Sequence, residues 1–137
     1  MNKLNGIVSA IEHNDTMALV DVMVEHVNFS AILLETPVTA KYLHIGELVT
    51  LLFKETEVSL AKNLQGELSL RNRVTATVVG IEMGEILSAI TLNFLGKKLV
   101  SVITTRAVKR LQLKVGDAVE ALVKANEVAL MAGHHAD

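Results

Sequence analysis

The sequence predicts an all-β protein made of two tandem OB-like five-stranded barrels, each with one short helix in the order β-β-β-α-β-β. Three observations predict this fold. The 137-residue chain repeats itself at an offset of 70 without a gap, and its hydrophobic residues, half of the total, mostly alternate with polar ones. With three Phe, one Tyr and no Trp, any core must be built from aliphatic layers, which suits small barrels.

The internal repeat pairs residues 2–61 with residues 72–131. Most of the identical positions are apolar or belong to turns, which is what two copies of one fold share when packing is the common constraint. Lys54 and Lys124 form an identical basic pair within this set. The expected boundaries are 1–62 for the first barrel, 63–68 for a short polar linker, 69–132 for the second barrel and 133–137 for a tail.

Each copy is expected to contain five short strands with a period of two. In the first copy they are "NGIVSAIE", "MALVDVMV", "FSAILL", "LVTLLFK" and "EVSLA". In the second copy they are "TATVVGIE", "LSAITLNF", "LVSVIT", "AVEALVK" and "EVALM". Asn14, Asp15 and Gly84 supply turn chemistry between the first two strands, which indicates a hairpin in each copy.

A change of periodicity after the third strand predicts a helix. The segment "TTRAVKRLQL" puts Ala107 and Val108 on one helical face, and Thr104 or Thr105 can cap its start. The first copy has "ETPVTAKYLHI" at the equivalent place, where Pro37 is tolerated only in a first turn. We therefore expect one short helix in each copy.

The charge distribution favours the second half of the chain as the partner of an anion. Residues 1–66 hold four Lys and eight acids, whereas residues 67–137 hold nine Lys or Arg and seven acids. No apolar run approaches the roughly 18 residues that span a bilayer, and no charged leader precedes an apolar block. Because Cys is absent as well, we expect a soluble, cytoplasmic protein with no membrane partner.

The second copy resembles the Mop/TOBE family of molybdate-binding domains along residues 69–132. The likeness rests on ordered blocks: "SLRN" at the start, "VITT" at the end of the third strand, "LQLKVGD" in a turn and "KANEV" near the end. Two such copies resemble the di-domain molbindins, cytoplasmic storage or buffering proteins for molybdate, and also the effector-binding half of molybdate-responsive regulators. Because no DNA-binding segment precedes the first copy, the molbindin interpretation is preferred. The resemblance implies that the chain binds molybdate or tungstate for storage, buffering or sensing.

The same resemblance implies an oxyanion site at interfaces between barrels, in a homo-oligomer that is a trimer or a dimer. The Ser-x-Arg start of one barrel would hold the anion together with the Thr strand end and the Lys-Ala-Ser segment of a neighbour. The chain departs from the family where Leu70 replaces Ala, Ala107 replaces a frequent Ser, and Asn126 replaces the last Ser, although its amide is still a donor. Carried over, the expected oxyanion-binding residues are Ser69, Arg71, Thr104, Lys124, Ala125 and Asn126, with Lys54 and Thr56 as the first copy's counterparts of Lys124 and Asn126.

Elementary chemistry independently supports such a site. A tetrahedral oxyanion offers only acceptors, so it needs converging hydroxyls, backbone N–H groups and one or two cations. Ser69 and Arg71 lie two residues apart, hence on one side of an extended chain, and Lys124 and Asn126 obey the same rule. Each pair supplies half a cage. The Ser-Arg pair has no counterpart in the first copy, which keeps only one half-cage.

Two alternative functions stay open at the level of the sequence. One is a structural di-barrel that has lost its ligand and serves as an assembly module. The other is a nucleic-acid-binding OB module, which the scarcity of aromatic residues and the mild acidity disfavour. The choice among molybdate, tungstate and sulfate, and the number of chains in the oligomer, also stay open.

Individual site residues carry simpler interpretations too. Thr104 is as good a helix cap as a ligand, and Lys124 suits a solvated strand end equally well. His13, His26 and His44 lack the close spacing of metal ligands, so no site for a bare metal cation is expected. The chain contains no Gly-rich phosphate loop and no nucleophile elbow, so the sequence predicts a binding protein and not an enzyme.

Overall fold

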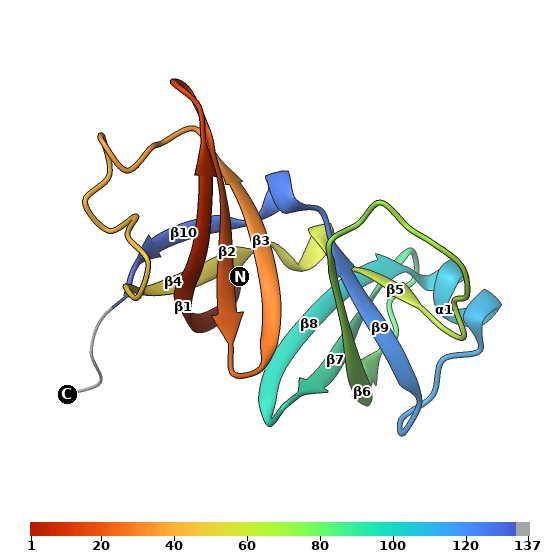
Figure 1. The fold of residues 1–137 in the computed structure, drawn as a ribbon. Helices are drawn as coiled ribbons and strands as arrows, with labels where there is room; N and C mark the ends of the chain where they lie inside the picture. Colours follow the sequence, from red (N-terminus) through yellow and green to blue (C-terminus); the bar gives the residue numbers. More distant parts are fainter. Residues whose placement is uncertain (134–137) are drawn as a thin grey trace. The chain divides into compact units, whose positions relative to one another are not determined.

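The computed structural model describes residues 1–133, which form two compact units, each built on one five-stranded antiparallel sheet (Figure 1). Unit 1 contains residues 1–2 and 54–123, and unit 2 contains residues 3–53 and, of the described chain, residues 124–133. The two sheets confirm the predicted all-β fold class. Most of the expected tail, with His134 and His135, lies outside the described residues.

Unit 1 has the strand order β5-β9-β6-β7-β8, and its edge strands β5 and β8 approach each other, as in a closed barrel. One α-helix and one short 3₁₀ turn complete it. The elements of unit 1 are η1 (Glu55–Glu57), β5 (Ser59–Ala61), β6 (Asn72–Glu82), β7 (Leu87–Phe94), β8 (Lys97–Thr104), α1 (Thr105–Leu111) and β9 (Ala118–Val123).

Unit 2 has the equivalent order β10-β4-β1-β2-β3, with β10 and β3 close to each other. Buried and half-exposed residues alternate along β2, so one face of the strand lines the core. The elements of unit 2 are β1 (Asn2–His13), β2 (Ala18–Val24), β3 (Val27–Leu33), β4 (Leu48–Phe53), η2 (Ala125–Glu127) and β10 (Ala129–Ala132).

The sequence repeat is also a structural repeat. The hairpin of unit 2 pairs Val8 with Val22, and that of unit 1 pairs Val78 with Leu92, 70 residues further on. Each first strand carries a bulge at the residue after this valine, where the register shifts by one. The shared register and bulge confirm the prediction of two copies of one fold.

The fifth strand of each copy lies in the sheet of the other. β5 belongs to the first copy but pairs with β9, with Ser59 opposite Leu122, and β10 belongs to the second copy but pairs with β4, with Ala129 opposite Leu52. The compact units therefore differ from the expected barrels at 1–62 and 69–132. The backbone explains this, because Lys54 and Val58, which flank η1, are both extended, and the described chain has no positive φ there that would turn it back.

The expected helix forms in the second copy only. The side chain of Thr104 accepts a hydrogen bond of 3.1 Å from the backbone N–H of Ala107 and so caps α1, as predicted. The first copy has Leu34 and Pro37 at these two positions, so both the acceptor and the donor of the cap are missing, and residues 34–47 form turns. Val38 is consequently 88% exposed, whereas the equivalent Val108 is 4% exposed. The prediction of a helix in the first copy is wrong.

The cores are aliphatic, as the composition predicts. Phe29 and Phe94 are the largest fully buried side chains, and Val, Leu, Ile and Ala supply most of the remaining core. Within residues 1–133, no helix is both long and apolar enough to cross a membrane.

Candidate functional site

Ser69 and Arg71 lie at the entrance to β6. Both are exposed, and Arg71 directly precedes Asn72, the first residue of the strand. Asn72 pairs with Val123, the last residue of β9, and Lys124 directly follows Val123. Chain connectivity therefore puts Arg71 and Lys124 at the same end of the β6–β9 ladder.

The half-cage residues of each copy lie on equivalent 3₁₀ turns. Lys124 precedes η2, which contains Ala125 and Asn126, and Lys54 precedes η1, which contains Thr56. The backbone angles of the two lysines are nearly the same, with φ −71° and ψ 140° at Lys124 and φ −71° and ψ 147° at Lys54. The two turns thus present their residues in the same local conformation.

The turn η1 also leads into the strand that pairs with β9. Ser59 at the start of β5 is opposite Leu122 near the end of β9, and Leu122 is opposite Arg73 near the start of β6. Seven candidate residues therefore lie on segments that lead into, or directly follow, one end of the β5-β9-β6 ladders of unit 1, whose strands Figure 1 labels. They are Ser69, Arg71, Lys124, Ala125, Asn126, Lys54 and Thr56.

Thr104 is not brought to this end. It is opposite Leu87 in the β7–β8 ladder and therefore aligns with the far end of β6. Together with Glu85, Ile86 and Arg106 it lines a cavity of about 220 Å³ at the start of α1. Its side-chain oxygen already accepts the capping hydrogen bond of the helix. Within one chain Thr104 is thus a structural cap.

The cations at this end differ in whether an acid neutralises them. Arg73 forms a two-pronged ion pair with Glu120, with 2.9 Å between Nη2 and Oε1, and this pair lowers the pKa of Glu120 and raises that of Arg73. Among the described residues, the side chains of Arg71, Lys124 and Lys54 make no hydrogen bond or ion pair. No described acid therefore neutralises these three charges through an ion pair.

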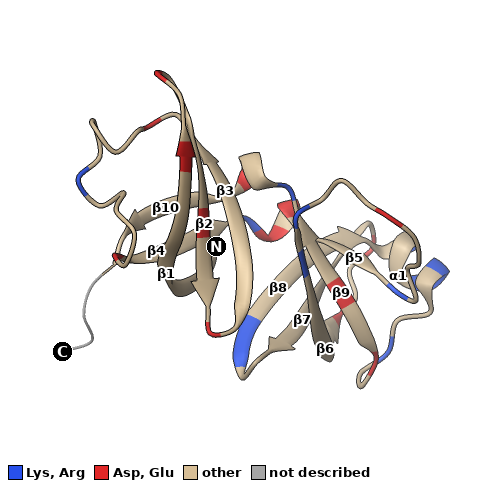
Figure 2. Cartoon of the chain, in the orientation of Figure 1, with Lys and Arg blue, Asp and Glu red and all other residues tan. Residues whose placement is uncertain are grey.

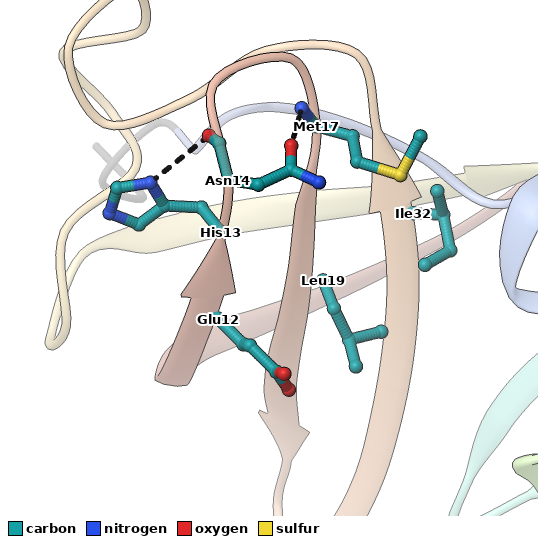
Figure 3. Close-up of a pocket in the computed structure, with 6 residues that line it drawn as sticks. All are labelled: Glu12, His13, Asn14, Met17, Leu19 and Ile32. Atoms are coloured by element: carbon teal, nitrogen blue, oxygen red, sulfur yellow. Dashed lines mark hydrogen bonds between the residues drawn. The ribbon is translucent and has the colours of Figure 1, made fainter.

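A separate hollow lies at the tip of the β1–β2 hairpin in unit 2 (Figure 3). It measures about 220 Å³ and contains Glu12, His13 and Asn14 beside apolar side chains. The side-chain oxygen of Asn14 is used within the turn, where it accepts hydrogen bonds of 2.9 Å from the backbone N–H groups of Thr16 and Met17. The lining contains an acid and no Lys or Arg, so this hollow is a poor oxyanion site.

Sequence reasoning missed a buried hydroxyl ring in unit 1. The hydroxyl of Thr105 donates to the carbonyl of Gly84 over 2.8 Å, and the side-chain oxygens of Ser88 and Thr105 are 2.7 Å apart. The backbone N–H of Gly84 donates to Ser88 over 3.3 Å, which closes the ring. The first copy has Ala18 and Glu35 at the hydroxyl positions, and this divergence between the copies was the available signal.

No cluster of three or more His, Asp or Glu side chains in residues 1–133 could hold a metal ion.

Figure 2 shows basic residues on α1 and at the start of β8, whereas the turn between β4 and β5 carries acids. Of the two half-cage turns, η1 contains two acids, Glu55 and Glu57, whereas η2 contains one, Glu127.

Comparisons with known proteins agree with this fold. Residues 68–130 match the family model described as the TOBE domain. The crystal structure of the cytoplasmic molybdate-binding protein ModG, with molybdate bound, is similar to this chain over 96% of both chains, with 32% identity and a TM-score of 0.90. The molybdenum import ATP-binding protein ModC of Brucella abortus (strain 2308) is 36% identical over 126 residues, which cover 91% of this chain.

This chain covers only part of ModC but nearly all of ModG. The chain spans about a third (33%) of the length of the curated relatives it matches, so it corresponds to one part of ModC. Its similarity to ModG, in contrast, covers nearly the whole of both chains. The chain therefore belongs to the Mop/TOBE-domain family, and within it to the members that carry two repeats in one chain.

Proposed function

We propose that this chain binds a tetrahedral oxyanion, molybdate or tungstate, at the end of the β5-β9-β6 ladders, without redox or hydrolytic chemistry. One observation carries the proposal: connectivity puts Arg71 and Lys124 at the same end of one ladder, and neither cation has an acidic partner in the described chain. Both proteins named above support the choice of ligand, since one is described as a molybdate-binding protein and the other as a molybdenum import ATP-binding protein.

The chemistry of the donor set fits a dianion with four acceptor oxygens. Arg71 and Lys124 would supply charge, while Ser69, Asn126 and the backbone N–H of Ala125 would supply directional donors. Ser69 and Arg71 are exposed, so an anion can reach them without rearrangement of the fold. Lys54 and Thr56 would supply the equivalent donors of the first copy.

We further propose that the functional form is a homo-oligomer, a trimer or a dimer. Thr104 aligns with the far end of β6 from Arg71, so it can join the same anion only from a second copy of the chain. Such an assembly would act in the cytoplasm in storage, buffering or sensing of the oxyanion, in line with the description of ModG as cytoplasmic.

The proposal is tested by calorimetric titration of the chain with molybdate, tungstate and sulfate at matched ionic strength. Charge-assisted contacts contribute roughly 1.5–3 kcal/mol each, so Arg71→Ala and Lys124→Ala should each weaken molybdate binding by about ten- to a hundred-fold. Lys109→Ala is the matched control, because this lysine lies on the exposed face of α1 and the substitution removes the same charge.

The outcomes are distinct. Weaker molybdate binding with Arg71→Ala and Lys124→Ala, but not with Lys109→Ala, supports the site. Equal effects of all three substitutions would mean that binding depends only on the net charge of the protein. If molybdate and tungstate at millimolar concentration give neither heat nor thermal stabilisation, the binding proposal fails, and a structural assembly module becomes the better account. Sedimentation with and without molybdate tests the oligomer.

A further inference from the structure

The two half-cage turns differ at one position in charge. η1 contains Glu55, Thr56 and Glu57, whereas η2 contains Ala125, Asn126 and Glu127. Offset by 70, Glu55 thus stands where the second copy has Ala125. Because the backbone angles before the two turns agree within a few degrees, the side chain of Glu55 projects from the same place on its turn as the methyl group of Ala125.

The carboxylate of Glu55 is ionised and engaged with a cation. It accepts a hydrogen bond from the terminal ammonium group of Met1 and forms an ion pair with it. The hydrogen bond from this ammonium group is the largest cause that holds the pKa of Glu55 below its ordinary value. The side chain of Glu55 is 35% exposed, so an anion approaching η1 from solvent meets this carboxylate beside the ammonium group of Met1.

We infer that Glu55 is a specificity-determining residue that disfavours oxyanion binding at η1, the turn of the first copy. The oxyanion then binds mainly at η2, the turn of the second copy. The inference rests on the proposed function and deepens it. An ionised carboxylate repels a dianion directly, and through its ion pair it also neutralises the terminal ammonium group of Met1, a cation that could otherwise attract the anion. In the second copy, Ala125 does neither, which leaves the charge of Lys124 unopposed by its nearest neighbour on the turn.

The test is a calorimetric titration of the wild-type chain and of the Glu55→Gln variant with molybdate. Removing one charge a few ångströms from a dianion in water should strengthen binding at η1 by roughly three- to ten-fold. Glu55→Ala, which reproduces the residue of the second copy, should give the same gain. The matched control is Glu82→Gln, an equal charge change at the far end of β6.

A second substitution locates the gain. Lys54→Ala introduced into Glu55→Gln should remove the added binding, because Lys54 is the cation on the same turn. Thermal unfolding of each variant confirms that the measured chains are folded. The expected pattern is a gain with Glu55→Gln and Glu55→Ala, no gain with Glu82→Gln, and reversal by Lys54→Ala.

The results that would overturn the inference differ from those that would overturn the proposed function. If the wild-type chain binds molybdate and Lys124→Ala weakens it, but both Glu55 variants bind as the wild type does, only this inference fails. It also fails if Glu82→Gln gives an equal gain or if the gain survives Lys54→Ala. If neither the wild type nor any Glu55 variant binds, the proposed function fails together with it.

Discussion

Thr105→Val should destabilise unit 1 by removing the centre of its buried hydroxyl ring. Thr105 is 6% exposed and Ser88 is 1% exposed, so neither hydroxyl can turn to water as a substitute partner. Because the single hydroxyl hydrogen of Thr105 goes to Gly84, Ser88 must donate to Thr105. Valine has nearly the same shape as threonine, so the substitution removes hydrogen bonds and creates no cavity.

The expected loss follows from the number of bonds that are broken. Two of the three bonds of the ring disappear. The carbonyl of Gly84 loses the hydroxyl donor of Thr105, and the hydroxyl of Ser88 keeps as its acceptor the sulfur of Met83, a weak acceptor 3.6 Å away. Neutral hydrogen bonds contribute about 1 kcal/mol each, and a buried unsatisfied group costs about 1–3 kcal/mol, so the free energy of unfolding should fall by about 2–3 kcal/mol. For a unit of this size, that corresponds to a decrease in Tm of roughly 8–24 °C.

The assay is urea unfolding followed by circular dichroism, with two further variants. Thr105→Ser keeps the hydroxyl and loses one buried methyl group, so it should cost only about 1 kcal/mol. Ser88→Ala combined with Thr105→Val should cost less than the sum of the two single substitutions, because both hydroxyls of one bond are then absent. The reasoning is refuted if Thr105→Val costs no more than Thr105→Ser, or if the double variant is additive.

Three further outcomes are expected. Lys62→Met should destabilise unit 1 at neutral pH, because its ammonium group donates to two backbone carbonyls at the end of α1 and to Asp117 over 3.1 Å. The pKa of Asp117 is lowered first by a hydrogen bond from the backbone N–H of Lys114 and then by the hydrogen bond from Lys62. The stability that the ionised Asp117 contributes is present above the ordinary carboxyl pKa and should be lost as the pH falls through the lowered pKa. Urea unfolding measured over a series of acidic pH values should show a smaller loss in Lys62→Met than in the wild type. Gly116→Ala should cost about 1 kcal/mol in urea unfolding, since the φ of Gly116 is +98° and no neighbour crowds the new methyl group. The single tyrosine, Tyr42, should titrate by ultraviolet absorbance with a pKa of about 12, raised first by burial and then by its hydrogen bond to Glu35, and Glu35→Gln should lower that value.

Periodicity located the strands because each strand has one face towards a core. Alternation over β2 or β6 is a local property of the sequence, and the gapless offset of 70 then fixed the equivalence of the two copies. The prediction of a helix in the first copy rested on the equivalence of "ETPVTAKYLHI" to "TTRAVKRLQL" in the repeat and on Pro37 being tolerated in a first turn. Leu34 and Pro37 remove both partners of the capping hydrogen bond, and this information was present in the sequence.

The sequence supplied the candidate site residues as a set, which stays a prediction, and it did not supply their arrangement. Spacing indicated that Ser69 and Arg71 act together, but only the ladder register relates them to Lys124. The position of Thr104 depends on long-range pairing between β7 and β8, so its separation from Arg71 could not be derived from local pattern. The charge of Glu55 was visible in the sequence, yet its significance follows from the matching conformations of the two turns.

The exchange of fifth strands was invisible to sequence reasoning because the two strands are interchangeable. Leu60 faces Ala121 and Leu130 faces Leu51, and these pairs are related by the same offset of 70, so either strand fits either sheet. The sequence pattern therefore predicts a fifth strand in each sheet but does not say which copy supplies it. The connection before that strand decides this, because the extended residues around η1 and η2 direct the chain away from its own copy. One consequence is that unit 1 depends on the first copy for more than a strand. Lys62, which follows β5, holds the end of α1 in the second copy, so a substitution in one copy should alter the stability of the other.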